Sequence, residues 1–124
     1  MQITTRAADA PRHQLPGVEF TVLASPSLGS AGLCTWKLTL APGVRGDNTH
    51  TIDRDEVFMV LSGSVRVTPD GDELHPGDAA VVPAGEPIAV SNLGDGPAEV
   101  HVAITAGFSA KGPDGSTMQP PWSL

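Results

Sequence analysis

The feature that most constrains this sequence is the density of residues that interrupt regular secondary structure. Its 124 residues include 14 glycines and 12 prolines, spread along the whole chain. Because these residues end or turn a segment, few stretches are long enough for a helix of ordinary length. Apolar residues make up 40% of the chain, which is enough to fill one core. The composition favours a single all-β domain of short strands joined by tight turns.

Alternation of apolar and polar residues predicts where the strands lie. Residues 34–40 alternate, with one face made by Cys34, Trp36, Leu38 and Leu40. Further strands are predicted at residues 19–24, 56–61, 79–82, 88–91 and 98–106, and a short one within 44–54. The Ser-Gly-Ser turn at 62–64 predicts a hairpin that joins 56–61 to 65–68. Roughly eight to ten such strands describe a sandwich or a closed barrel.

The two ends of the chain do not alternate and are predicted to be arms. We expect one domain over residues 1–124, with its core at about 18–106, an N-terminal arm at 1–17 and a C-terminal tail at 107–124. The tail carries Phe108, Met118 and Trp122, apolar groups that are costly to leave in water. It is therefore expected to dock on the barrel or on a second subunit.

Charge and cysteine content limit the partners and the setting. Seven basic residues against 14 acidic ones give a net charge of −7, which repels nucleic acid and anionic lipid surfaces. The single cysteine, Cys34, cannot form an internal disulfide, and residues 1–10 lack the order of a secretory signal. No apolar run approaches the roughly 20 residues of a membrane helix. These features predict a cytoplasmic protein that binds neither nucleic acid nor membrane.

The turn around residues 77–92 resembles the second motif of the cupin superfamily. That motif runs Gly, five residues, Pro, one residue, Gly, two residues, His, three residues, Asn. Gly77, Pro83, Gly85 and Asn92 stand at those positions, and Ile88 stands in place of the histidine. Glycine suits turns with positive φ and asparagine suits turn positions, so the match also makes physical sense.

Residues 43–63 resemble the first cupin motif, in two possible registers. The family pattern runs Gly, five residues, His, one residue, His, three or four residues, Glu, six residues, Gly, and Glu56 and Gly63 have its final spacing. A three-residue spacer puts His50 and Ile52 at the two histidine positions, with Gly43 one residue too far away. A four-residue spacer fits Gly43 but places Thr49 and Thr51 at the histidine positions.

The resemblance, which spans about residues 35–105, implies an all-β, cupin-type jelly-roll barrel. In cupins with a full site, three histidines and a glutamate hold a divalent metal inside the barrel, and the metal serves dioxygen chemistry, isomerisation, decarboxylation or ring closure. Here only His50 and Glu56 remain in one register and Glu56 alone in the other. Isoleucine has no lone pair to donate, so we expect no cofactor. The alternative is one divalent transition metal in a rearranged site.

Three side chains are candidates for catalysis: Glu56, His50 and His101. A glutamate inside an apolar barrel has a raised pKa, and near His50 it would form an acid/base pair. A purely structural Glu56, hydrogen-bonded to backbone or to a threonine, is the competing interpretation. His101 alternates with Glu99 and Ala103, so it reaches Glu56 or His50 only if that set faces the cavity. Otherwise it faces solvent or a subunit partner.

Apolar side chains are expected to line the pocket and to bind the ligand. The predicted wall residues are Trp36, Ile52, Phe58, Ile88 and Val90. Such a pocket suits a small organic molecule with an apolar or aromatic surface better than a sugar. Three hypotheses follow: a metal-independent isomerase, cyclase or dehydratase, a metalloenzyme with a rearranged site, and a non-catalytic ligand-binding or structural cupin. A homodimer is expected from the resemblance and from the apolar tail.

Overall fold

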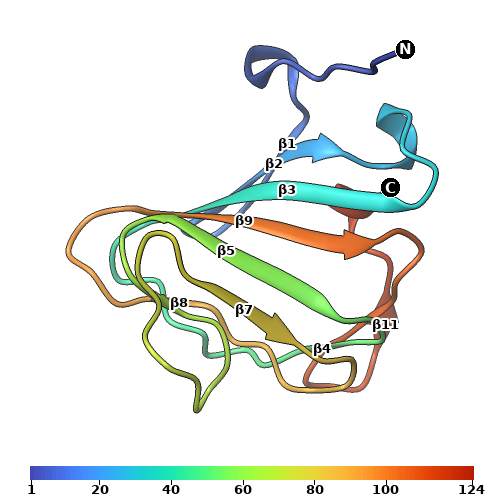
Figure 1. Cartoon of the computed structure of the whole chain (residues 1–124). Helices are drawn as coiled ribbons and strands as arrows, with labels where there is room; N and C mark the ends of the chain where they lie inside the picture. Colours follow the sequence, from blue (N-terminus) through green and yellow to red (C-terminus); the bar gives the residue numbers. More distant parts are fainter.

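A six-stranded antiparallel sheet forms one wall of the molecule in the computed structural model, which describes all residues 1–124 (Figure 1). Its strands stand in the order β1-β2-β3-β9-β5-β7. Their bounds are β1 Arg12–Leu15, β2 Val18–Ala24, β3 Leu33–Leu40, β5 Glu56–Ser62, β7 Ala79–Val82 and β9 Ala98–Thr105. The strands predicted at 19–24, 34–40, 56–61, 79–82 and 98–106 are thus all present, with ends shifted by one residue at most.

The opposite wall is built from short strands and turns, which lie below the large sheet in Figure 1. Two small sheets have the orders β11-β10-β4 and β6-β8. Their strands are β4 Thr51–Ile52, β6 Val65–Arg66, β8 Ser91–Asn92, β10 Ala110–Lys111 and β11 Thr117–Met118. The helices are three 3-10 turns, η1 Ala7–Asp9, η2 Pro26–Leu28 and η3 Pro121–Ser123. None of them has the length or apolar character that a membrane crossing requires.

The core lies between the two walls and follows the alternation of the long strands. On β3, every second residue from Cys34 to Leu40 is buried, and on β9 the same holds from Ala98 to Ile104. These two strands pair over their whole length, so their buried residues form continuous cross-strand rows. Seventeen buried apolar residues make one core cluster. The single all-β domain expected from the sequence is confirmed.

The hairpin predicted between residues 56–61 and 65–68 is wrong. Strand β5 has β9 on one edge and β7 on the other, so no edge is left for the segment after it. The chain instead turns at Gly63, with a φ of 78°, and crosses to the opposite wall. There Val65 pairs with Leu74 and with Asn92. A Cβ on Gly63 would lie 2.8 Å from Cβ of Ala98, so this turn needs glycine for space as well as for conformation.

The N-terminal arm is not wholly irregular, because residues 12–15 form strand β1. It pairs with β2 through a turn at Gly17, where φ is 75°. The burial of β1 does not alternate, and three of its four residues are exposed. An edge strand held by backbone hydrogen bonds needs no buried face, which is why apolar patterning did not reveal it.

The C-terminal tail docks on its own barrel. The ring of Trp122 stacks on Phe20 with centroids 3.8 Å apart, and the Cys34 thiol donates a hydrogen bond to Ser123 O at 3.3 Å. Strand β10 pairs with β4, and Phe108 is 1% exposed inside the core. Phe108 and, in part, Trp122 thus gain the burial expected of the tail, whereas Met118 stays 52% exposed. The homodimer stays a prediction.

Asn92 fastens the end of β3 to the turn after β8. Its side-chain amide donates to Leu40 O, Ala41 O and Gly96 O at 3.1, 3.2 and 2.9 Å, and its Oδ1 accepts a hydrogen bond from Gly94 N at 2.9 Å. The side chain is 3% exposed. The asparagine of the second motif is therefore a structural residue that satisfies four backbone groups at once.

We expect Asn92→Ala to lower the free energy of unfolding by about 2–4 kcal/mol, because it strips buried backbone groups of their partners. Urea unfolding followed by circular dichroism measures the change. Ser91→Ala, next to it on β8, removes the single hydrogen bond that Ser91 Oγ accepts from Gly46 N and is the matched control. Equal destabilisation by the two variants would contradict this role of Asn92.

Candidate functional site

Glu56 is the only acidic or basic side chain among the buried residues. It opens β5, where alternation turns Glu56, Phe58 and Val60 inward. Its neighbour across the β5–β7 pair is Val82, which is 2% exposed. The carboxyl group makes no hydrogen bond and no ion pair, and burial raises the pKa of Glu56 to about 8. At neutral pH this side chain is mostly a neutral acid.

The structural interpretation of Glu56 depends on hydrogen bonds to its carboxyl group. A structural glutamate would accept hydrogen bonds from backbone or from Thr49 or Thr51, and neither threonine donates to it. Its isolation is costly for stability, since a buried polar group without a partner disfavours the folded state. The hydrogen bonds that a structural Glu56 would accept are therefore absent from the structure.

His50 lies on the opposite wall and also turns toward the interior. It exchanges two backbone hydrogen bonds with Ile88, at 3.1 and 2.8 Å, so the two side chains share one face. Ile88 is 2% exposed and Ile52, two residues after His50, is 6% exposed. The structure thus favours the three-residue spacer, with His50 and Ile52 at the two histidine positions of the first motif.

The imidazole of His50 is half-buried. Burial lowers its pKa, and a hydrogen bond with the backbone of Asn48 opposes this shift in part. At neutral pH the ring is therefore neutral and carries one free lone pair. No direct hydrogen bond or ion pair joins His50 to Glu56, so the two groups do not neutralise each other.

His101 does not belong to the interior, which corrects one candidate from the sequence. Its partners across the sheet are Lys37 on β3 and Met59 on β5, and all three are only half-buried. The buried set on β9 is Val100, Val102 and Ile104. Because successive side chains of a strand point to opposite faces, His101 lies on the outer face and Glu56 on the inner face.

The predicted wall residues gather in the core as expected. Trp36, Ile52, Phe58 and Ile88 are buried, and Val90 is half-buried and packs against the same cluster. The structure adds Phe108, whose ring centroid lies 6.1 Å from that of Trp36. From the sequence, Phe108 was expected in the C-terminal tail, because one apolar residue after a glycine turn has no periodicity that would assign it to the core.

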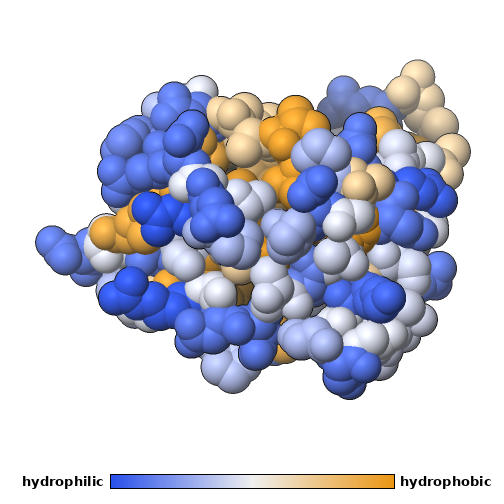
Figure 2. Space-filling view, turned by 90° about the horizontal axis from the view of Figure 1, so that it is seen from below, coloured by the Kyte–Doolittle hydropathy of each residue, from blue (hydrophilic) through white to orange (hydrophobic).

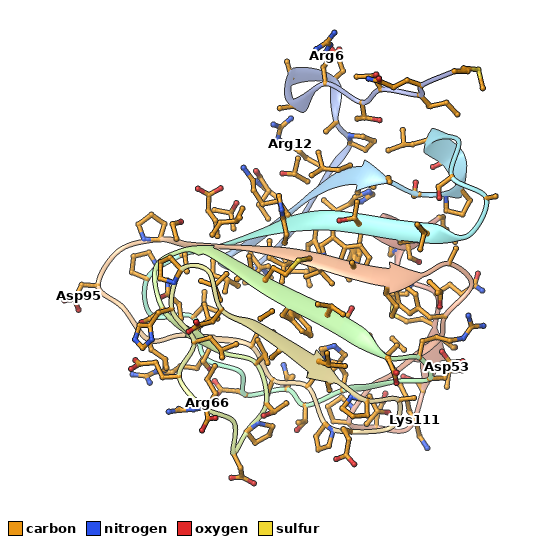
Figure 3. The ribbon with its side chains drawn as sticks, in the orientation of Figure 1. Arg6, Arg12, Asp53, Arg66, Asp95 and Lys111 are labelled. Atoms are coloured by element: carbon orange, nitrogen blue, oxygen red, sulfur yellow. The ribbon has the colours of Figure 1, made fainter.

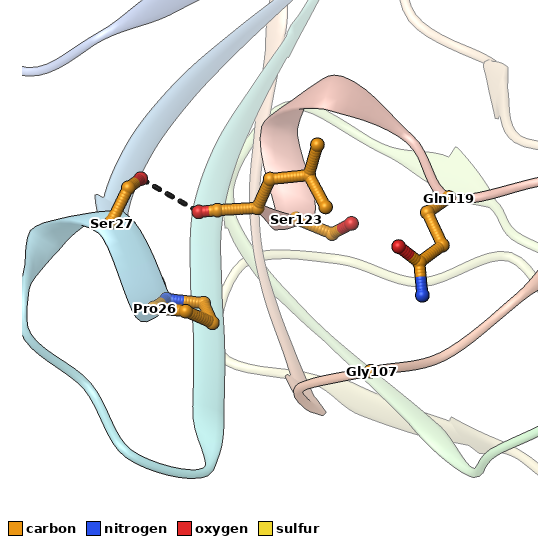
Figure 4. Close-up of a pocket in the computed structure, with 6 residues that line it drawn as sticks. Pro26, Ser27, Gly107, Gln119 and Ser123 are labelled. Atoms are coloured by element: carbon orange, nitrogen blue, oxygen red, sulfur yellow. Dashed lines mark hydrogen bonds between the residues drawn. The ribbon is translucent and has the colours of Figure 1, made fainter.

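Two surface cavities lie outside this set of residues. One of about 440 Å³ is lined by Pro26, Ser27, Gly107, Gln119, Ser123 and Leu124 (Figure 4). Another of about 240 Å³ lies beside β7 and is lined by Thr68, Pro69, Asp70, Val81, Val82, Pro83, Glu86 and Pro87. The second cavity adjoins the candidate site through Val82, the cross-strand neighbour of Glu56. Seen from the wall of short strands, the surface is mostly hydrophilic, with hydrophobic groups between (Figure 2).

The residues of the interior do not fit a metal centre. Two of the four ligand positions in the cupin pattern hold Ile52 and Ile88, which have no donor atoms. His101, the histidine considered as a recruited ligand, is on the other face of the sheet. No group of three or more His, Cys, Asp or Glu side chains comes together anywhere in the chain in a way that could hold an ion. A tight site normally needs three or four protein ligands, and this one offers two.

Solved structures share this architecture. A sugar phosphate isomerase of the cupin superfamily from Silicibacter pomeroyi is 26% identical, with a TM-score of 0.65 over 80% of this chain and 67% of its own. The polyketide cyclase RemF from Streptomyces resistomycificus is 19% identical, with a TM-score of 0.73 over 85% and 80%. Oxalate decarboxylase from Bacillus subtilis is 23% identical, with a TM-score of 0.71 over 84% of this chain and 29% of its own.

The sequence itself matches a family model. No significant match is found among curated proteins. The model described as "Cupin domain" matches residues 36–104, which is more than half of the chain and holds both motifs, Glu56 and His50. The chain belongs to the cupin family.

Proposed function

We propose that the barrel interior binds a small, largely apolar organic molecule and that Glu56 and His50 move protons to and from it. One observation carries the proposal: Glu56 is 2% exposed, lies among apolar side chains and has no partner. A folded chain gains nothing in stability from such a group. An acid/base role in a pocket gives it a purpose, since groups with shifted pKa values cluster at functional sites.

The protonation states at neutral pH define the chemistry. Glu56 holds its proton because of burial, and His50 is neutral for the same reason. In an enolisation, His50 takes a proton from the carbon next to a carbonyl while Glu56 gives its proton to the carbonyl oxygen. The C–H bond breaks, an O–H bond forms, and the enol leaves a carboxylate and an imidazolium behind. The imidazolium of His50 then returns a proton to carbon, and the enol oxygen returns one to the carboxylate of Glu56. Both side chains are thereby restored.

Isomerisation, dehydration and aldol-type cyclisation all contain such a step. The names of two similar structures, a sugar phosphate isomerase and a polyketide cyclase, support this class of reaction at the level of fold and distant relationship. The residues that line the interior indicate which of these ligands it suits. Ile52, Ile88, Phe58 and Trp36 provide apolar surface, and none of the seven lysines and arginines is buried, so a phosphate would find no counter-charge inside. An aromatic or polyketide-like ketone suits the interior better than a sugar phosphate.

The test uses 4-chromanone, a bicyclic aromatic ketone, as a probe. Exchange of its protons next to the carbonyl for deuterium, followed by NMR at neutral pD, reports enolisation directly. We expect the protein to accelerate exchange above the buffer rate and Glu56→Gln to remove at least about 100-fold of that acceleration, the usual contribution of one acid/base group. His50→Gln is expected to lose the acceleration as well.

The control is His75→Gln, which changes a histidine exposed at the surface and should leave exchange unchanged. Circular dichroism and probe binding establish that each variant folds and still holds the ketone. Unchanged exchange in Glu56→Gln would overturn the catalytic role. Binding of 4-chromanone without any acceleration would point to a ligand-binding protein without catalysis.

A further inference from the structure

The indole nitrogen of Trp36 is the only side-chain nitrogen or oxygen in the chain that is fully enclosed by protein and lacks a hydrogen-bond partner. The residue is 3% exposed, and its indole Nε1–H finds no acceptor in the core. Folded proteins satisfy the large majority of such donors, because an unpaired one costs roughly 1–3 kcal/mol. Phenylalanine would fill the same place without this cost, so the donor itself calls for an explanation.

The position of Trp36 relates it to the candidate site. On the inner face of the large sheet, Trp36 on β3 pairs with Val102 on β9, and Val102 pairs with Phe58 on β5. Glu56 is two residues before Phe58 on the same face. Two strand spacings and one two-residue step separate Trp36 from Glu56, which puts their Cα atoms roughly 12 Å apart. Both residues lie on the inner face of the sheet, on either side of the row that holds Val102 and Ile104.

The charge of the interior limits what this pair can bind. Arginines and lysines lie at the periphery, as Arg6, Arg12, Arg66 and Lys111 show in Figure 3, and Lys37 pairs with Glu99 at 2.9 Å on the outer face. The indole is a donor only, and the protonated carboxyl of Glu56 is a donor as well. The interior therefore offers two separate hydrogen-bond donors, an apolar wall and no positive charge.

We propose that Trp36 is a second anchor of the ligand, and that the ligand is a neutral aromatic or polyketide-like molecule with two oxygen acceptors, one for the indole N–H of Trp36 and one for Glu56. This rests on the function proposed above and specifies its substrate class. Lactones, diketones and ketones that also carry a ring ether oxygen meet the requirement. Carboxylates and phosphates do not, because nothing inside compensates their charge.

Trp36→Phe tests the anchor by removing the donor while it keeps an aromatic ring in the core. The probes are 4-chromanone, which has a ketone and a ring ether oxygen, and tetralin, a hydrocarbon of similar shape without acceptors. At pH 6, we expect the variant to bind 4-chromanone about fivefold more weakly, the effect of one neutral hydrogen bond, and tetralin unchanged. Equal loss of affinity for both probes, or no loss for either, would overturn the proposal.

A second measurement uses the unsubstituted protein and does not depend on how the variant folds. The indole N–H proton of Trp36 in a ¹⁵N-labelled sample should move downfield when 4-chromanone binds and stay in place with tetralin, and Trp122 serves as the internal reference. The two proposals fail differently. Binding and exchange without a shift at Trp36 would contradict the anchor alone, whereas no binding of either probe would contradict both.

Discussion

Glu56→Gln is expected to make the protein more stable at neutral pH, and the gain should grow as the pH rises from 5 to 8. The ordinary pKa of a glutamate is 4.5, and burial raises that of Glu56 to about 8. Between these values the unfolded chain releases a proton that the folded chain keeps. The free energy of unfolding of the parent protein therefore falls by about 1.4 kcal/mol for each pH unit in this window.

The sign follows from which state binds the proton more tightly. Below pH 4.5 both states are protonated and the contribution of Glu56 to stability is fully present. It declines as the pH rises and is lost once the pH has passed about 8, where the folded state also ionises. Glutamine does not titrate. The free energy of unfolding of Glu56→Gln relative to that of the parent should therefore be about 3 kcal/mol higher at pH 7 than at pH 4.

Urea unfolding at pH 5, 6, 7 and 8 measures this difference. Glu86→Gln, which changes an exposed glutamate, is the matched control and should follow the parent at every pH. Parallel pH curves for the parent and Glu56→Gln would show that Glu56 ionises normally. The catalytic scheme would fail with that result, because it requires a protonated Glu56 at neutral pH. A stability gain together with lost exchange would instead be the usual trade-off between stability and activity.

Adding histidines at two positions should create a metal site where the parent has only two donors. Ile88 shares a face with its partner His50, and Ile52 is two residues from His50 on the same side. The double substitution Ile52→His and Ile88→His would therefore join His50 and Glu56 as a set of three imidazoles and a carboxylate, which suits first-row divalent metals. We expect the content of Zn²⁺ or Ni²⁺ to rise from well below one equivalent to about one per chain.

Elemental analysis after incubation with metal and gel filtration gives the stoichiometry. The same double substitution combined with His50→Ala and Glu56→Gln should bind much less tightly, because it leaves only two imidazoles. Metal should also raise the midpoint of thermal unfolding of the double variant and not that of the parent, because it binds only the folded chain. One tightly held equivalent in the unmodified protein would show that donors other than His50 and Glu56 complete a metal site.

Local patterns predicted the long strands because their physical cause is local. Residues 34–40 alternate since one face of β3 is buried and the other is not, and the same rule placed β5, β7 and β9 within a residue of their ends. The turns at Gly63, Gly77 and Gly85 were equally visible, and all three glycines have positive φ. The motif spacing was enough to identify the family, which the match over residues 36–104 confirmed.

Partner choice between strands was decided by the tertiary structure alone. The Ser-Gly-Ser turn predicted a hairpin, but both edges of β5 were taken by strands far away in sequence. Residues 12–15 joined the sheet as an edge strand, and because the strand has no buried face, no apolar alternation predicted it. Non-local pairing depends on which edges remain free when the whole chain has collapsed, and no local window contains that information.

The candidate site divides in the same way. The sequence alone predicted that Glu56, His50 and the two isoleucines occupy the ligand positions, because residue type and spacing determine whether donor atoms are present. Only the tertiary structure decided that His50 turns inward with Ile88, that His101 faces outward, and that the enclosed indole N–H of Trp36 lacks a hydrogen-bond partner. Side-chain direction and hydrogen-bond satisfaction arise from contacts between distant segments. For that reason they appear only when both walls of the barrel are in place.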